Sequence, residues 1–302
     1  MRRFEKPLLL LGLLLGLSAA AFVLLRRPPA PAPVAPAPTL PTLAPIAPAP
    51  PPISYPTPYS VPTTALPPRE ALRPGTLRIL VLGDSVANFL GMALRHRQDE
   101  AGTFVALRGV GDCSIFEAKT RIEKGKPVKG TSCAERWIED AAELRPDVTL
   151  VVMGGAFFNE KACEPEWQAS YEKRISELAD GMGTNAGRIV LTRVPYPIKD
   201  WRHGNVPARV DCLNDMLQRA AQKRGWPVLD LMGHVCPTPA CRVESDGAPI
   251  RPDGLHFDGV GAEETARWAL GELKRFAREE RDAGSDNRQG AGGAAIAQRT
   301  PR

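Results

Sequence analysis

The chain has 302 residues, of which 43% are hydrophobic and only 6% aromatic, and its formal net charge is +5. The surplus of positive charge lies in residues 1–27 and 282–302, so the long middle of the chain is close to neutral. A neutral body with few aromatic side chains lacks the basic surface that binds phosphate backbones. We therefore expect no nucleic-acid partner.

Residues 1–27 have the pattern of an export segment. An uncharged apolar run, residues 8–25, lies between Lys6 and Arg26 and is about as long as the shortest segments that span a bilayer. Residues 19–21, Ala-Ala-Ala, offer a cleavage site for a signal peptidase, but the apolar run continues past them. The sequence favours an uncleaved, single-pass membrane anchor over a cleaved signal peptide, with the rest of the chain in the periplasm or at the cell surface.

A proline-rich linker follows the anchor. More than half of the 31 prolines fall within residues 28–74, where they alternate with Ala, Thr and Val. Such a segment cannot build a core and favours extended polyproline II, which at about 3.1 Å per residue spans roughly 120 Å. At the other end, residues 282–302 are rich in Gly and Ala and are predicted to be disordered. One folded domain is therefore expected over residues 75–281.

The domain reads as buried strands that alternate with helices. The expected strands cover residues 77–82, 104–107, 147–153, 188–194 and 227–231, and the expected helices cover residues 86–97, 134–144, 164–182, 207–224 and 261–281. This alternation predicts an α/β fold, a three-layer α/β/α sandwich around a central five-stranded parallel sheet. Sites in such sheets lie at the carboxyl ends of the strands.

Six cysteines lie in the predicted domain. They are Cys113, Cys133, Cys163, Cys212, Cys236 and Cys241. An even number in an exported domain predicts disulfides, whereas zinc is disfavoured because no C-x-x-C pair or nearby histidine cluster gives ligand spacing. We therefore expect no metal. A bridge between Cys236 and Cys241 would close a short loop, and our hypothesis for the others is Cys113–Cys133, which leaves Cys163–Cys212.

Ser85 is the first candidate for chemistry. It follows the first strand in a Gly-Asp-Ser turn, so its hydroxyl lies near the free N–H groups that open the next helix and that can stabilise an oxyanion. The alternative is that Ser85 only caps the helix. His256 lies before the last helix, and Asp253 precedes it by three residues. A serine needs a base and the base needs an orienting partner, so these three residues predict a nucleophilic serine.

The Gly-Asp-Ser turn and the D-x-x-H motif resemble blocks I and V of the SGNH (GDSL) hydrolase family, over nearly all of residues 75–281. The resemblance implies the flavodoxin-like SGNH fold without a cofactor, with Ser85 as nucleophile, His256 as general base and Asp253 as its orienter. More narrowly, the cysteine pattern and residues 251–257 resemble the SGNH domains appended to integral-membrane acyltransferases of bacterial cell envelopes. Such domains handle O-acyl, often O-acetyl, groups on surface glycans.

The oxyanion donors depart from the family pattern. Besides the N–H of Ser85, Gly111 is the best match for the block II glycine, with Gly109 or Asp112 as alternatives. Block III falls on residues 154–157 and lacks its asparagine, and Asn159 comes three residues late. The loss of one such donor lowers kcat by about 10²–10³ in a studied serine hydrolase.

Together these features predict a membrane-tethered, extracytoplasmic serine esterase or O-acyltransferase. Its expected substrate is an O-acylated, most simply O-acetylated, cell-envelope glycan, and a membrane protein that donates acyl groups is a further candidate partner. The choice between hydrolysis and transfer stays open. The alternative function is a catalytically weak SGNH-fold module that binds glycan or lipid in the same cleft.

Overall fold

The structure, a computed structural model, describes residues 67–111, 113–116, 120–123, 126–129, 134–202, 204–238 and 240–296. The predicted anchor and most of the predicted linker lie outside these residues. Within the part of the chain that is described, none of the helices has the length and apolar character needed to cross a membrane.

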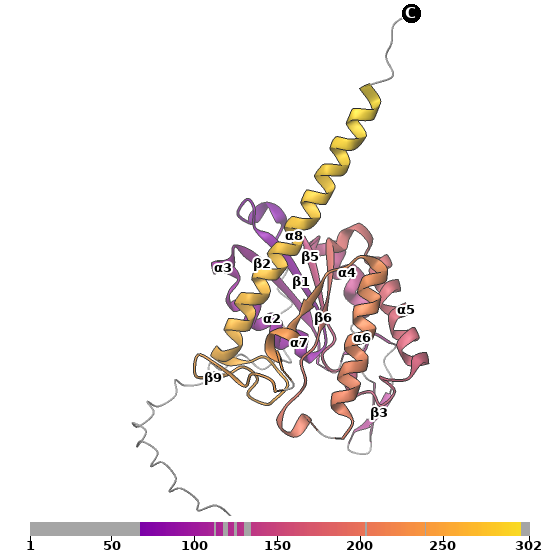
Figure 1. The fold of residues 1–302 in the computed structure, drawn as a ribbon, viewed down its shortest axis with the longest axis vertical. Helices are drawn as coiled ribbons and strands as arrows, with labels where there is room; N and C mark the ends of the chain where they lie inside the picture. Colours follow the sequence, from indigo (N-terminus) through magenta and orange to yellow (C-terminus); the bar gives the residue numbers. More distant parts are fainter. Residues whose placement is uncertain are drawn as a thin grey trace, which may run out of the picture. The chain divides into compact units, whose positions relative to one another are not determined.

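A five-stranded parallel sheet forms the centre of the domain, as predicted (Figure 1). In spatial order its strands are β2 (Thr103–Gly109), β1 (Leu77–Gly83), β5 (Val148–Val152), β6 (Arg188–Arg193) and β7 (Val228–Asp230). This order is that of flavodoxin-like sheets. Every residue of β1 is buried, as expected for a central strand that is covered on both faces.

The register of the sheet brings three strand ends to one level. Gly83, at the end of β1, pairs with Gly109 of β2 on one side and with Val152 of β5 on the other. The loops that follow these three strands therefore open at the same carboxyl edge. This is the edge where ligands bind in open α/β sheets.

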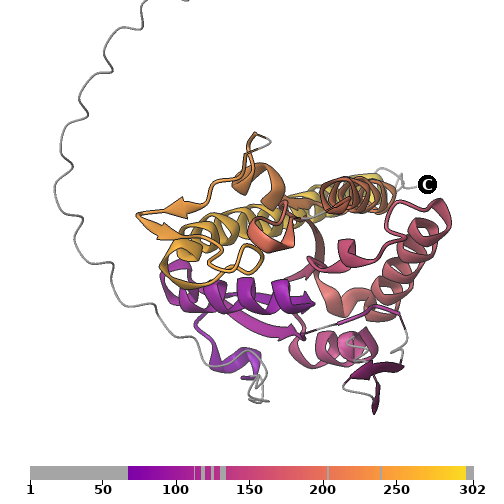
Figure 2. The same ribbon diagram turned by 90° about the horizontal axis from the view of Figure 1, so that it is seen from below.

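Helices cover both faces of the sheet (Figures 1 and 2). The long ones are α2 (Ser85–His96), α4 (Trp137–Leu144), α5 (Pro165–Met182), α6 (Val206–Arg224) and α8 (Gly259–Ile296). Helix α2 packs against α8, whereas α5 packs against both α4 and α6. Right-handed crossovers place α4, α5 and α6 on the face opposite α2, which confirms the predicted three-layer sandwich.

Several short elements were not predicted. The short helices and strands are α3 (Gln98–Ala101), β3 (Thr120–Glu123), β4 (Lys126–Lys129), α7 (Leu231–Val235), β8 (Glu244–Ser245) and β9 (Ala248–Pro249). Short 3₁₀ helices cover Arg69–Ala71, Ala156–Phe158, Gly183–Ala186 and Lys199–Trp201, and a further one at Ala134–Arg136 forms the start of the helix predicted over residues 134–144. Elements of two to five residues are too short to show a hydrophobic period, so the sequence pattern does not reveal them.

Helix α8 is longer than expected. The prediction ended it at Arg281 and left residues 282–302 disordered, but the helix continues to Ile296. The sequence permits this length, because no proline lies between Pro252 and Pro301 to stop a helix. Residues 297–302 lie outside the described part of the chain.

Two of the three predicted disulfides are present. Cys163–Cys212 joins the loop before α5 to α6, and Cys236–Cys241 closes the short loop after α7. Cys113 is also disulfide-bonded. The predicted partner of Cys113, Cys133, lies outside the described residues, so that pairing stays a prediction.

Candidate active site

The turn after β1 presents Ser85 at the edge of the sheet. Gly83 has a φ of 139°, a conformation that favours glycine, and Ser85 is the first residue of α2. Asp84, not Ser85, is the residue that caps the helix: its Oδ1 accepts the N–H of Val86 at 2.9 Å. The alternative that Ser85 serves only as the N-cap is therefore wrong, and its hydroxyl is available for another partner.

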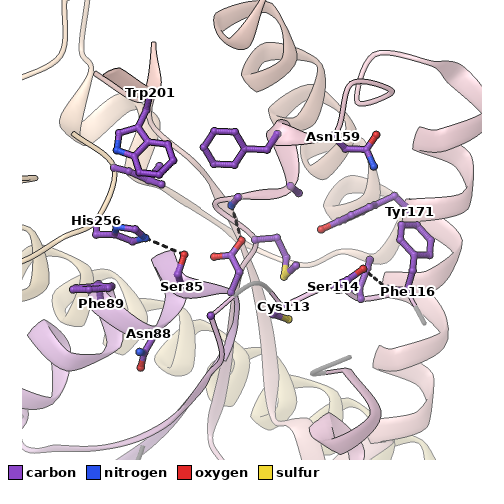
Figure 3. Close-up of a pocket in the computed structure, with 18 of the residues that line it drawn as sticks. Ser85, Asn88, Phe89, Cys113, Ser114, Phe116, Asn159, Tyr171, Trp201 and His256 are labelled. Carbon is purple, nitrogen blue, oxygen red and sulfur yellow. Dashed lines mark hydrogen bonds between the residues drawn. The ribbon is translucent and has the colours of Figure 1, made fainter. Parts of the chain in front are cut away.

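The structure brings Ser85 and His256 together across the sequence. Ser85 Oγ lies 2.9 Å from His256 Nε2, and His256 Nδ1 lies 2.6 Å from Asp253 Oδ2 (Figure 3). The other carboxylate oxygen of Asp253 accepts the N–H groups of Leu255 and His256 at 2.9 and 2.8 Å. The D-x-x-H turn thus fixes the carboxylate, which in turn fixes the imidazole. All three predicted catalytic residues stand in one hydrogen-bonded row.

Two aromatic rings hold the imidazole of His256 from the sides. The ring of Phe89 lies 4.5 Å from it between centroids, and Trp201 meets it edge-on at 6.5 Å. Phe89 is four residues after Ser85 on α2, so both side chains point to the same face of that helix. That spacing was the available signal for Phe89. Trp201 ends a short 3₁₀ helix in the loop after β6, and nothing in the sequence pattern pointed to it.

Asp253 is ionised under any ordinary condition. Partial burial would raise the pKa of its carboxyl, but the hydrogen bonds from the His256 ring and from the N–H groups of His256 and Leu255 lower it to about 2. An ionised Asp253 only accepts, so His256 Nδ1 carries the proton. The lone pair of His256 Nε2 is then free to face the hydroxyl of Ser85, as a general base requires.

This lowered pKa predicts a pH-dependent contribution to stability. A carboxyl with a pKa of about 2 in the folded state and about 3.9 in the unfolded state stabilises the fold above pH ~4, and the effect is lost as the pH falls toward 2. Because Asp253 is half exposed, we expect less than about 1 kcal/mol, or a Tm lower by about 2–4 °C in Asp253→Asn at pH 6. Thermal denaturation of both proteins from pH 2 to pH 7 measures it. A Tm difference that stays constant down to pH 2 would contradict the assignment.

Asp84 ties the first turn to the loop after β5. Its second carboxylate oxygen accepts the N–H of Gly155 at 2.5 Å, while the first caps α2. Burial raises the pKa of Asp84 to about 6, against the opposing effect of these backbone hydrogen bonds. Asp84 therefore positions the turn that carries Ser85. The sequence placed Asp84 in the Gly-Asp-Ser motif but gave no role to its side chain.

The predicted oxyanion donors lie in different places. The N–H of Ser85 opens α2 and so lacks an intrahelical partner. Gly111 lines the same cavity as Ser85 and His256. Gly109 instead packs closely under α2, since a Cβ there would lie 2.5 Å from the backbone nitrogen of Asn88. The remaining alternative for the block II donor, Asp112, lies outside the described residues.

Asn159 does not stand beside Ser85. It lines the cavity on the side away from Ser85 and His256 (Figure 3), and its carboxamide oxygen accepts the N–H of Lys161 at 2.9 Å. The N–H of Gly155, which occupies part of the block III position, is engaged by Asp84. The structure therefore brings together the three triad residues but not the predicted asparagine donor.

A cavity of about 650 Å³ opens in front of Ser85 and His256. Its wall is unusually aromatic for a chain with so few aromatic residues. The aromatic residues that line it are Phe89, Phe116, Phe158, Trp167, Tyr171 and Trp201. A cavity of this size holds an organic ligand much larger than an acetyl group. Among the described residues, no cluster of three His, Cys, Asp or Glu side chains is placed to hold a metal ion.

Solved structures with a similar fold include acylhydrolases and esterases. A lipase/acylhydrolase from Enterococcus faecalis is 17% identical, with a TM-score of 0.46 over 66% of this chain and 96% of that one. A GDSL-like lipase from Bacteroides thetaiotaomicron is 17% identical (TM-score 0.44; 67% and 88% covered). A catalytic mutant of an acetylxylan esterase from Geobacillus stearothermophilus is 15% identical (0.43; 65% and 93%). No protein-family model and no curated protein sequence matches the chain.

Proposed function

We propose that this chain is a serine esterase of the SGNH type. The observation that supports it is the row Asp253–His256–Ser85, with Ser85 Oγ at 2.9 Å from His256 Nε2 and His256 Nδ1 at 2.6 Å from the carboxylate. A serine hydroxyl is a weak nucleophile, and a base within hydrogen-bonding distance activates it. Side chains placed only to bind a ligand have no need of this alignment.

The reaction follows from the geometry. Ser85 Oγ attacks the acyl carbon while His256 Nε2 takes the hydroxyl proton, and the carbonyl electrons move onto the oxygen. The N–H groups of Ser85 and Gly111 are the candidate donors to that oxyanion. As the intermediate collapses, the ester oxygen leaves with the proton from His256, and the acyl group stays on Ser85. Water or a sugar hydroxyl then attacks the acyl carbon, with His256 again as the base. The bond from the acyl group to Ser85 Oγ breaks, and this oxygen takes the proton back from His256. The choice of acceptor separates an esterase from an O-acyltransferase.

The substrate proposed is an O-acetyl or other O-acyl ester of a cell-envelope glycan. The aromatic wall of the cavity suits the apolar faces of sugar rings, and the cavity exceeds what an acetyl group needs. The apolar run of residues 8–25 and the proline-rich linker support a domain tethered to the membrane and exported from the cytoplasm. We propose no nucleic-acid partner and keep a membrane acyl donor as a candidate partner.

A catalytically weak binding module is the second candidate. The position of Asn159 away from Ser85 favours it, because one side-chain donor to the oxyanion is then missing. A weak catalyst with an intact triad would still acylate Ser85. Covalent labelling therefore tests whether Ser85 is a nucleophile, and the rate of ester turnover separates the two functions.

A fluorophosphonate probe tests the proposal. We expect the native protein to be labelled at one residue and Ser85→Ala to be unlabelled, because a base, His256 Nε2, lies within hydrogen-bonding distance of Ser85 Oγ. Ser114→Ala is the matched control: Ser114 lines the same cavity, but its Oγ accepts the N–H of Phe116. We expect Ser114→Ala to be labelled like the native protein. Labelling that survives in Ser85→Ala, or a native protein that stays unlabelled, would contradict the proposal.

A further inference from the structure

Tyr171 carries a buried hydroxyl without a partner. It lies on α5 and is only 2% exposed, and among the described residues nothing hydrogen-bonds its phenolic oxygen. Its ring is held by Trp167, at 4.7 Å between ring centroids, and by the edge of Phe116 at 5.7 Å. Buried hydroxyls are nearly always paired, because leaving one unpaired lowers stability. The unpaired hydroxyl of Tyr171 is therefore a candidate group for hydrogen-bonding a ligand.

The hydroxyl of Tyr171 points into the active-site cavity. Tyr171 lines the cavity that Ser85 and His256 line, and its oxygen is directed inward from the side opposite His256 (Figure 3). Burial, and to a smaller extent the charge of Asp84, raise the pKa of Tyr171 well above its ordinary value. The phenol thus keeps its proton and acts as a hydrogen-bond donor, not as a base.

The surroundings of this hydroxyl restrict what it binds. Phe116 and Trp167 pack on the Tyr171 ring and supply apolar surface at this end of the cavity, where Tyr171 supplies one donor. An acetyl group has two carbons and fills little of a 650 Å³ cavity when it is attached to Ser85. A long alkyl chain would reach the hydroxyl but offers no oxygen to it. A sugar ring offers both apolar C–H faces and oxygen acceptors.

We propose that Tyr171 is a specificity-determining residue, whose hydroxyl donates a hydrogen bond to an oxygen of the sugar that carries the ester. This rests on the proposed esterase function and names the part of the substrate that the inner end of the cavity recognises. When a buried donor is hydrogen-bonded only by the correct ligand, an analogue that lacks the acceptor leaves that donor unpaired. Such a site therefore discriminates strongly against the analogue. Tyr171 thereby favours sugar esters over esters of apolar alcohols.

The test compares two acetate esters in native protein and Tyr171→Phe. Methyl 6-O-acetyl-glucopyranoside has a sugar as its alcohol, and phenyl acetate has a ring without a hydroxyl. We expect the ratio of kcat/KM for the sugar ester to that for phenyl acetate to fall about tenfold in Tyr171→Phe. Tyr196→Phe is the control, since the Tyr196 hydroxyl bonds Asp211 and the residue does not line the cavity. An unchanged ratio in Tyr171→Phe would overturn the proposal.

Two further measurements separate this inference from the proposed function. Removing an unpaired hydroxyl should leave the Tm of Tyr171→Phe equal or higher, whereas a fall in Tm would show that the hydroxyl is paired within the fold and would overturn the proposal. Tryptophan fluorescence follows the binding of methyl glucopyranoside without chemistry, because Trp167 contacts Tyr171. We expect Tyr171→Phe to bind this sugar more weakly than native protein. If native protein cleaves neither ester but this difference in binding is found, the esterase function is refuted and the role of Tyr171 is not. Equal binding, or binding by neither protein, would overturn the role of Tyr171.

Discussion

Ser85→Ala and His256→Ala are each expected to lower kcat for p-nitrophenyl acetate by about 10⁴- to 10⁶-fold. The alanine at position 85 removes the proposed nucleophile, and the alanine at position 256 removes the proposed base 2.9 Å from it, without which the hydroxyl stays protonated. His234→Ala is the matched control. The ring of His234 stacks on Trp268 at 3.9 Å and does not line the cavity, so its loss should leave kcat within a few-fold of the native value.

The double variant makes this prediction sharper. Residues that act as a unit are non-additive, so Ser85→Ala with His256→Ala should be nearly as active as either single variant. Steady-state kinetics on the four proteins measures the coupling, with the uncatalysed rate subtracted. A double variant slower than both single variants by the product of their effects would mean that Ser85 and His256 act independently. The triad would then be wrong.

The sheet and the triad were predictable because each rests on a strong local signal. The apolar run of β1 ended in a glycine turn, which located Ser85 at the end of a buried strand. The D-x-x-H turn already contained the pairing of Asp253 with His256, because three residues are enough to turn a carboxylate back onto the ring. Parallel alternation then required the two motifs to meet at one edge, although 171 residues separate Ser85 from His256.

The walls of the cavity were not predictable in the same way. Trp201 reaches the cavity from the loop after β6 and Tyr171 reaches it from α5, and their positions depend on how those elements pack. Asn159 was placed by its nearness to the block III position in the sequence, but a 3₁₀ turn at Ala156–Phe158 carries it away from Ser85. The sequence located the candidate triad, whereas tertiary packing decides which ligand reaches it.

Gly83→Ala is expected to destabilise the domain by about 4 kcal/mol or more and to abolish activity. A Cβ at position 83 would lie 1.8 Å from the carbonyl oxygen of Val152 and 2.9 Å from the Cβ of Ala87. Neither atom is the end of a flexible side chain, so β1 would have to move away from β5. The hydrogen bond from the N–H of Asp84 to Val152 O, at 3.3 Å, would break, and Ser85 would move with the turn.

Gly102→Ala is the matched control for this substitution, because it separates the clash from the cost of a positive φ. Gly102 has a φ of 61° and no atom within 4 Å of an added Cβ. Alanine there should therefore lower the free energy of unfolding only through its left-handed backbone, by about 1–2 kcal/mol. Urea denaturation of both variants gives the two free energies, and p-nitrophenyl acetate hydrolysis reports on the position of Ser85. If both variants lost equally little stability and kept equal activity, the close approach of β1 to β5 at Gly83 would not be what holds the nucleophile in place.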